Sequence, residues 1–559
     1  MAEILDPDGR LGHRGRIAAF HAAWIAILLA AAWKRFSIPL WPLAEGDSAA
    51  ILRPAMLFLR GYGFQPFGSQ PFLYPGLLAA VLAVFKDFRA ITILSHLLGL
   101  GGGLLLLASW RTAGGLLPDR RCPPLLYDAA GLVMFAIALF ALAPMQMEYA
   151  IRPDSICPFF AALSICCIAR FLHSRTRAHA TKRKWIAWGA AALFVGFLLP
   201  TLKPSFWLSC MLSTIPVWFA VFDRREKWAP RALMAGPILA AIFFFLLLPG
   251  RHFSRMDPTN SSFSSESIFS IHALIIREQI SADANDGNGV PYSREDLEST
   301  LALLDRGIKA SRAANPRKFA ALGYDADGLL HHDSFFLKME TTHGSEWPLQ
   351  FYRYYFGRTW ERRPRAMAAK VITQLRLFYN LDCPAYRQRE IGLKEMYRYS
   401  IRNLNYYYGQ AFLEQWPPTA SLLQALTTNA ARAPEIRTPR LLDWTLAALA
   451  ATYFPVFLLF LAALPWALLN RERRARYGRF IALLAVAYGY NVGNNLGISI
   501  FHTLEVVRYS HVQFATTLFS QMLGVTFLWE IAAPIFGRTS PGPKGTDGAS
   551  RPLAPIARK

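Results

Sequence analysis

Long apolar runs recur along this 559-residue chain, and they limit its possible fold more than any other feature of the sequence. A helix needs about 20 apolar residues to cross the hydrocarbon core of a bilayer, and many of these runs have roughly 17 to 25. Hydrophobic residues make up 53% of the chain and charged residues only 17%, whereas a soluble protein carries about 25% charged residues. We therefore predict an all-α polytopic membrane protein.

The runs predict about ten transmembrane helices, seven before a polar insertion and three after it. Strips rich in Lys and Arg follow the second, fourth, sixth and eighth spans, and the strip at 175–184 contains no acid. Because such strips stay on the cytoplasmic side, we expect both chain termini in the cytoplasm. The expected spans are about 17–33, 90–110, 128–146, 156–172, 185–202, 205–222, 232–249, 441–469, 480–500 and 512–535.

Lys34 and Arg35 oppose the predicted orientation of the first span, because they follow it on the expected outer side. We expect these two side chains to extend toward lipid headgroups. A cleaved signal peptide is an open alternative, since Ala30-Ala31-Ala32 is a passable small-residue cleavage site.

Four regions follow from this topology. Residues 1–250 are expected to form a transmembrane module with a catalytic outer loop at 44–89, which includes an interfacial helix at 74–85. Residues 251–440 are expected to form a mostly helical extracytoplasmic domain, because Leu and Ile recur at helical spacing and no long β-alternation occurs. Residues 441–536 would supply the last helices, and residues 537–559 a disordered cytoplasmic tail.

An aromatic cluster inside the extracytoplasmic region, from Trp347 to Trp360, is followed by arginines. Aromatic rings beside cations can contact a sugar and a phosphate, and they can equally form a belt at the membrane interface. The sequence leaves both interpretations open.

The overall charge and the cysteines exclude several classes of protein. The net charge of +23 lies mostly in short strips between apolar runs, a pattern typical of membrane topology and anionic lipid contact rather than of nucleic-acid binding. Six scattered cysteines predict neither a disulfide framework nor, without Cys-x-x-Cys spacing, a structural zinc.

Ionisable residues gather at the outer ends of the predicted spans, although charges near a bilayer are costly unless they are solvated or paired. Any one of them could be a solvated loop charge. Because all of them face one side in this topology, together they predict a site at the outer membrane surface. They are Asp47, Asp154, Lys203, Arg251, His252, Arg508 and His511.

The order of short motifs along the chain resembles the GT-C superfamily of membrane glycosyltransferases, which includes protein O-mannosyltransferases, aminoarabinose transferases acting on lipid A, and catalytic oligosaccharyltransferase subunits. The resemblance covers residues 17–250 and, more loosely, 500–530. It does not extend to most of 251–440. The motifs are Glu45-Gly-Asp47 in the first outer loop, Tyr74-Pro75-Gly76 at the interfacial helix, Pro153-Asp154 in the second outer loop, Lys203-Pro204 after the fifth span, and Arg508-Tyr509 before the last.

This resemblance implies an inverting transfer of a sugar from a polyprenyl-phosphate donor to an acceptor hydroxyl. Asp47 matches the position of the family's catalytic acid, although many relatives carry two adjacent acids where this chain has Glu45-Gly-Asp47. Lys203 and Arg508 match cations for the departing phosphate. The other implied substrate-binding residues are Arg251 and His252 as reserve cations, Tyr509, Tyr74 beneath the donor lipid, and Asp154, which in some relatives helps to bind a divalent metal.

The expected partners are the polyprenyl-phosphate sugar, membrane lipids, and a lipid, polysaccharide or protein acceptor, in a bacterial cytoplasmic membrane; no nucleic acid is expected. The cofactor is unknown, and a divalent cation is not required by the sequence. Two other classes remain open: a transporter or flippase of an amphiphilic glycolipid, and a membrane scaffold. A transporter would use polar spans, and only the ninth span is polar. Its residues Tyr488, Tyr490, Asn491, Asn494 and Asn495 are expected to face the bundle interior.

Overall fold

The computed structural model is almost entirely helical in the residues it describes. One antiparallel pair of two-residue strands, β1 (Ile391–Gly392) and β2 (Glu435–Ile436), is the only named sheet among them. The described residues are 10–65, 71–118, 120–175, 182–223, 226–249, 262–287, 289–314, 322–331, 335–388, 391–409, 413–414, 416–501 and 506–536.

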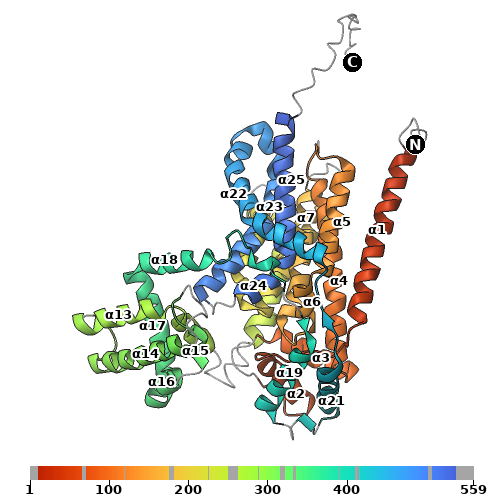
Figure 1. Ribbon diagram of the computed structural model, residues 1–559. Helices are drawn as coiled ribbons and strands as arrows, with labels where there is room; N and C mark the ends of the chain where they lie inside the picture. The colour runs from red at the N-terminus through yellow and green to blue at the C-terminus, as the bar shows by residue number, and fades with distance from the viewer. Residues whose placement is uncertain are drawn as a thin grey trace, which may run out of the picture.

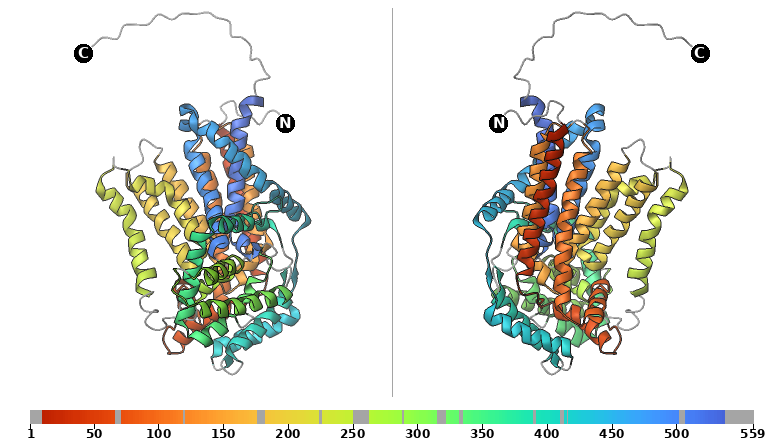
Figure 2. Two further views of the ribbon diagram at one scale, coloured as in Figure 1. Left: turned by 90° about the vertical axis from the view of Figure 1, so that its left-hand side faces the viewer. Right: turned by 90° about the vertical axis from the view of Figure 1, so that its right-hand side faces the viewer.

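Long helices stand side by side in one bundle (Figures 1 and 2). Among the described residues, seven helices are long and apolar enough to cross a membrane, or eight if a bent pair counts as one span, which confirms the polytopic all-α prediction. The bundle contains α1 (Arg10–Phe36), α4 (Arg89–Gly114), α5 (Pro124–Phe140), α6 (Leu142–Tyr149), α7 (Cys157–Ser174), α8 (Lys182–Leu202), α9 (Trp207–Val221), α10 (Trp228–Ile242), α22 (Arg440–Leu469), α23 (Arg471–Phe501) and α25 (Phe514–Phe536).

Helices occupy all ten places where a span was predicted, but the two at 480–500 and 512–535 are not among the seven or eight. Those two are α23 and α25, which stand within the bundle yet carry many polar side chains. A span count of ten therefore stays a prediction. The bent pair is α5 and α6, which meet at 43° where Ala141 is extended. Together they cover the predicted span 128–146.

The start of α1, the end of α25 and the turn between α22 and α23 lie at one end of the bundle (Figure 1). The basic strip that begins at Arg471 forms the first turns of α23. This arrangement is the one that the positive strips predict for the cytoplasmic side. We call the opposite end of the bundle the site end.

Two short helices form much of the predicted loop 44–89 at the site end. α3 (Leu73–Phe85) is the predicted interfacial helix, and α2 (Ser48–Leu59) lies in a stretch that was predicted to be loop. With 12 and 13 residues, each is too short for a hydrocarbon core about 30 Å thick. Both bury apolar side chains, such as Leu52 and Leu82, in one shared core.

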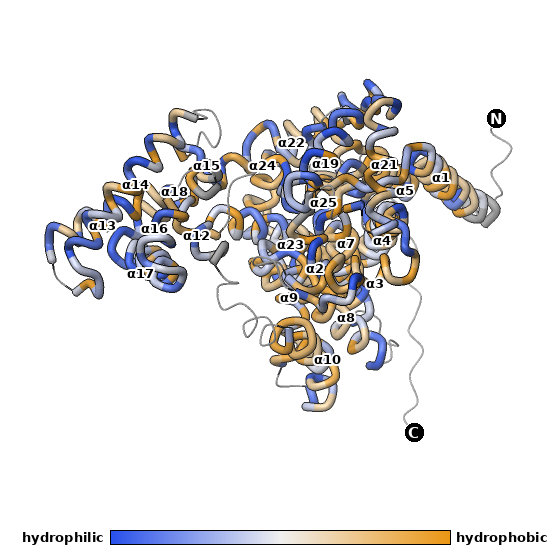
Figure 3. Tube along the Cα trace, turned by 90° about the horizontal axis from the view of Figure 1, so that it is seen from below, coloured by the Kyte–Doolittle hydropathy of each residue, from blue (hydrophilic) through white to orange (hydrophobic). Residues whose placement is uncertain are grey.

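The described residues between 262 and 375 form a helical lobe beside the bundle (Figures 1 and 3). The aromatic cluster of the sequence supplies its core, where Phe351, Tyr352 and Tyr355 are buried and Phe269 stacks on Phe335. These three rings of the cluster are therefore neither an interfacial belt nor a ligand surface. The lobe contains α12 (Ser262–Ser270), α13 (Ala273–Asp286), α14 (Arg294–Ala314), α15 (Ala326–His331), α16 (Phe335–His343), α17 (Glu346–Arg362) and α18 (Pro364–Leu375).

The rest of the polar insertion folds back onto the site end instead of joining the lobe. α19 (Leu393–Tyr408) and α21 (Pro417–Arg432) pack against each other and share the core of α2 and α3. The strand pair β1–β2 lies beside α19. α19 and α21 therefore join the core of the predicted catalytic loop directly, a connection that no sequence pattern indicated.

The polar residues of α23 face the bundle interior, as predicted. Asn491 Nδ2 donates to Tyr453 Oη at 3.2 Å, and Thr516 Oγ1 donates to Asn491 Oδ1 at 2.5 Å. Gln513 Nε2 donates to Asn495 Oδ1 at 2.7 Å. Hydrogen bonds of this kind join helices in an apolar environment. They give Asn491 and Asn495 a packing role that needs no transported solute.

Candidate functional site

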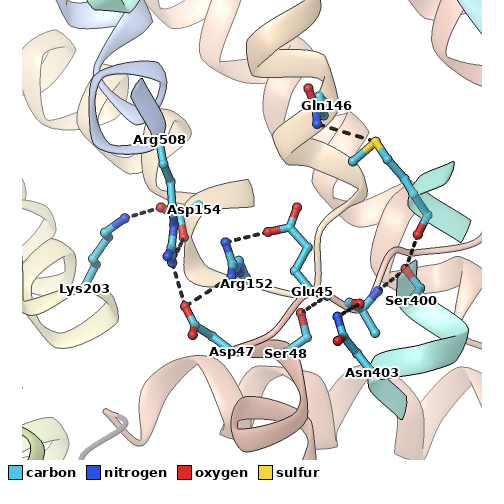
Figure 4. Close-up of polar contacts among 12 residues, drawn as sticks. Glu45, Asp47, Ser48, Gln146, Arg152, Asp154, Lys203, Ser400, Asn403 and Arg508 are labelled. Carbon is cyan, nitrogen blue, oxygen red and sulfur yellow. Dashed lines mark hydrogen bonds and ion pairs between the residues drawn. The ribbon is translucent and has the colours of Figure 1, made fainter. Parts of the chain in front are cut away.

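Six charged side chains from four separate segments meet at the site end (Figure 4). We call them the charge cluster. Its three acids and three bases give it a formal charge of zero. The members are Glu45 and Asp47 before α2, Arg152 and Asp154 between α6 and α7, Lys203 between α8 and α9, and Arg508 in α24 (Val506–Val512).

Asp47 is held by two arginines. Arg508 Nη2 lies 2.9 Å from Asp47 Oδ2 and 3.4 Å from Asp154 Oδ2. Arg152 reaches the same Asp47 oxygen with Nη2 at 3.2 Å, and its Nη1 lies 2.5 Å from Glu45 Oε2. The structure therefore brings together Asp47, Asp154 and Arg508, three residues that are distant in the sequence.

Lys203 and Asp154 form the buried half of the cluster. Their side chains contact each other through Nζ and Oδ1, with exposures of 9% and 3%. Burial would raise the pKa of the Asp154 carboxyl, but Lys203 and Arg508 outweigh it and hold the pKa well below its usual range. Burial lowers the pKa of the Lys203 ammonium. The phenol ring of Tyr509 lies 4.3 Å from Lys203 Nζ and 5.6 Å from Arg508 Cζ, within cation–π range.

Asp47 differs from Asp154 in its access to solvent. Its side chain is 47% exposed, against 3% for Asp154. Desolvation acts to raise the pKa of Asp47, but Arg152 and Arg508 outweigh that effect and keep the pKa below its usual value. Asp47 is therefore an ionised carboxylate that a ligand can reach, engaged by two cations in this state.

Acid titration distinguishes Asp154 from other carboxylates. A carboxyl whose native pKa is depressed adds stability above its unfolded pKa, and this contribution is lost as the pH falls through the native pKa. We expect the unfolding temperature of Asp154→Asn to fall less than that of the unchanged protein on acidification from about pH 5 to pH 2. Thermal unfolding at several pH values measures this, with exposed Asp382 replaced by Asn as the matched control. Equal acid slopes for Asp154→Asn and the unchanged protein would contradict the assignment.

A backbone link holds the two acidic loops side by side. Leu43 and Ala150 form a parallel bridge, in which Leu43 N donates to Tyr149 O at 2.7 Å and Ile151 N donates to Leu43 O at 3.0 Å. Asp47 follows one strand of the bridge and Asp154 the other by four residues each. Their separation is therefore set by backbone hydrogen bonds and not by the side chains alone.

A buried ion pair anchors the second loop from behind. Arg35 Nε and Nη2 donate to Glu148 Oε2 and Oε1 at 2.8 and 2.9 Å, and His96 Nδ1 lies 2.7 Å from Oε2. These side chains are at most 5% exposed. The expectation that Arg35 extends to headgroups is therefore wrong: the side chain turns into the protein, where Glu148 neutralises it. Gly99 leaves the space for Glu148, since a Cβ there would lie 2.1 Å from Oε1.

Tyr74 supports the same loop from α3. Its buried Oη lies 3.4 Å from Ser155 Oγ, which itself donates to Arg152 O at 2.8 Å. Tyr74 therefore contacts the loop that carries Arg152 and Asp154, through Ser155 and not through the charged side chains themselves.

The other predicted residues divide into two groups. Arg251 and His252 lie outside the described residues. His511 is buried, and its Nε2 lies 2.7 Å from the carbonyl oxygen of Arg387, a residue outside the charge cluster. Sequence reasoning missed Arg152 as a site residue. No periodicity singled it out, because the chain is extended at Arg152 but turns into a short 3-10 helix at Pro153–Ser155.

The donor set of the cluster does not suit a divalent cation. Among the described residues no group of three or more His, Cys, Asp or Glu side chains could hold a metal. The carboxylates of Asp47 and Asp154 already face Arg508, and a divalent ion would meet three cations. We therefore derive no step through a metal.

No protein-family model and no curated protein matches the chain. Among solved structures, the chain is similar to ArnT from Cupriavidus metallidurans in the apo state, with 14% sequence identity and a TM-score of 0.31 over 90% of this chain and 78% of that one. It is also similar to ArnT from the same organism bound to undecaprenyl phosphate, with 14% identity and a TM-score of 0.29 over 94% and 81% of the two chains. At this level of similarity, function has to be inferred from the charge cluster itself.

Proposed function

We propose that the protein is an inverting glycosyltransferase of the GT-C type. It would move a sugar from a polyprenyl-phosphate donor to an acceptor hydroxyl at the outer face of a bacterial cytoplasmic membrane. The observation that carries this proposal is one reachable carboxylate, Asp47, set against three clustered cations at the end of a helical membrane bundle.

The three cations suit a phosphate headgroup. Guanidinium groups form paired hydrogen bonds with phosphate oxygens, and an ammonium group adds a compact charge. Arg152 and Arg508 supply the first kind of contact and Lys203 the second. Exposed apolar side chains on the neighbouring short helices, such as Phe58 and Phe85, suit contact with a lipid tail.

An incoming phosphate must compete with a carboxylate, because the charge cluster is neutral before it arrives. Asp47 is the best candidate to leave: its side chain is 47% exposed, whereas Glu45 is 27% and Asp154 3% exposed. We therefore propose that phosphate displaces Asp47 from Arg508 and Arg152, while the buried pair of Lys203 and Asp154 stays in place.

This displacement would convert Asp47 into a better base. The two arginines lower the pKa of Asp47. Once they bind phosphate instead of Asp47, that effect is lost, and the negative phosphate would raise the pKa of Asp47 by like-charge repulsion. Asp47 would then take the proton of the acceptor hydroxyl as that oxygen bonds to the anomeric carbon. The bond from the anomeric carbon to phosphate breaks, and the polyprenyl phosphate departs with the electron pair, stabilised by Lys203 and Arg508.

Substitution of Arg508 by Met tests the donor site. Buried Asp154 still has Lys203 as an ion-pair partner in this variant. We expect polyprenyl-phosphate binding in nanodiscs to weaken roughly 10- to 100-fold, because hydrogen bonds to charged groups contribute about 1.5–3 kcal/mol. Transfer of a labelled sugar from the same donor should fall with it.

The control for Arg508→Met is Arg473→Met. Arg473 is also an arginine stacked on an aromatic ring, 4.0 Å from Trp466, but it lies in the basic turn at the other end of the bundle. Unchanged donor binding in Arg508→Met, or equal loss in both variants, would contradict the assignment of the phosphate site.

A further inference from the structure

The inner face of α19 is fixed to the segment that leads into Asp47. Ala44 N donates to Ser400 Oγ at 3.1 Å, and Asn403 Nδ2 donates to Ala44 O at 3.2 Å. Figure 4 shows Ser400 and Asn403 close to Glu45 and Ser48. α19 is thus held against the wall of the charge cluster, although about 350 residues separate the two in sequence.

The outer side of α19 presents exposed tyrosines beside a cation. Tyr399, Tyr406 and Tyr407 are 42%, 81% and 49% exposed. The guanidinium of Arg402 lies 5.0 Å from the ring centre of Tyr399. Positions 399, 402 and 406 follow one helical stripe. We call Tyr399, Arg402, Tyr406 and Tyr407 the tyrosine platform.

The tyrosine platform borders Asp47. A Cβ on Gly46 would lie 3.9 Å from Tyr399 Oη, so this phenol reaches the residue beside Asp47. At the other end of the platform, burial, the neighbouring Tyr406 and the charge of Asp47 raise the pKa of Tyr407. A molecule lying on the platform would therefore reach the carboxylate that takes the acceptor proton.

The chemistry of the platform is specific. Tyrosine rings combine an apolar face with a polar edge, which matches the C–H face and hydroxyl edge of a pyranose. Arg402 adds a donor for a carboxylate or phosphate group. The charged side chains of α19 also favour an anion, since Lys394, Arg398 and Arg402 outnumber Glu395.

We propose that the tyrosine platform is the acceptor subsite and that it binds a saccharide bearing an acidic group. This inference rests on the proposed function in taking Asp47 as the base. It narrows the acceptor from a lipid, polysaccharide or protein to an acidic glycan, with the accepting hydroxyl held at Asp47.

The test measures binding without transfer, on the full chain in phosphatidylcholine nanodiscs, by saturation-transfer-difference NMR. The probes are tetragalacturonate, neutral maltotetraose and tetra-aspartate. We expect tetragalacturonate to bind most tightly, and the double variant Tyr399→Ala with Arg402→Ala to weaken that binding at least about tenfold. A galacturonate headgroup on diacylglycerol in the same nanodiscs shows whether a lipid-borne source binds more tightly than the free glycan.

One control keeps the outcomes separate. Arg473→Ala removes a stacked arginine from the opposite end of the bundle and should leave binding unchanged. The inference is overturned, even if transfer is observed, if tetra-aspartate binds as tightly as tetragalacturonate. It is also overturned if the double variant of Tyr399 and Arg402 binds tetragalacturonate as tightly as the unchanged protein. If saccharide binding depends on the tyrosine platform but the protein transfers no sugar, the saccharide subsite is supported and the proposed glycosyltransferase function is contradicted.

Discussion

Asp47→Asn should lower sugar transfer by about 10²- to 10⁴-fold, the usual contribution of a positioned general base. Asn keeps the size of the side chain but cannot accept the proton of the acceptor hydroxyl. Donor binding should survive, because Asn no longer competes with phosphate for Arg508 and Arg152. The measurement is initial transfer from a labelled polyprenyl-phosphate sugar in proteoliposomes, with donor affinity measured on the same sample.

Glu45→Gln is the matched control for Asp47→Asn. Glu45 lies in the same loop and forms an ion pair with Arg152, whereas Asp47 forms ion pairs with both Arg152 and Arg508. We expect its transfer rate to stay within about tenfold of the unchanged protein, since the lost pair is partly exposed. A similar collapse of transfer in both variants, or full transfer in Asp47→Asn, would show that Asp47 is not the base.

The second large effect concerns folding. Glu148→Leu would leave the Arg35 guanidinium buried without its carboxylate, a situation that destabilises a protein by about 3–5 kcal/mol. We expect a clear loss of unfolding temperature in nanodiscs and loss of transfer, because the loop that carries Arg152 and Asp154 begins at this anchor.

The double variant Arg35→Met with Glu148→Leu distinguishes charge burial from general packing damage. With both charges removed, apolar side chains of similar size should restore most of the lost stability. If the double variant is as unstable as Glu148→Leu alone, the buried charge is not the cause.

The sequence predicted four of the six charged residues of the cluster, but it missed Arg152 and did not predict how the charges pair. Asp47, Asp154, Lys203 and Arg508 could be anticipated because short motifs occur in a fixed order and on one predicted side of the membrane. The spatial link between them depends on the bridge of Leu43 with Ala150, and such a bridge has no signature in two unrelated loop segments.

Which side chains are buried was the property least predictable from the local sequence. Arg35 follows an apolar span and reads as a headgroup contact, and its inward turn depends on Glu148, which is 113 residues away. Phe351, Tyr352 and Tyr355 read as a surface patch because the lobe that covers them is assembled from other helices. α2 was not predicted because the helix is short and contains Pro54, and proline usually interrupts a helix.

The insertion was the least predictable part of the chain. Helical spacing of Leu and Ile correctly indicated helices, yet periodicity cannot say which core a helix joins. α17 buries its apolar face in the lobe, whereas α19 buries Tyr397 and Leu404 beside α2. That division places the tyrosine platform beside Asp47.

The most direct test of the central claim is an electron cryomicroscopy structure of the full chain in nanodiscs with a polyprenyl phosphate added. We predict phosphate density in contact with Arg508 and Lys203, and an Asp47 carboxylate that has left Arg508 and points toward the tyrosine platform. Phosphate bound elsewhere, with the contact of 2.9 Å between Arg508 and Asp47 intact, would contradict it.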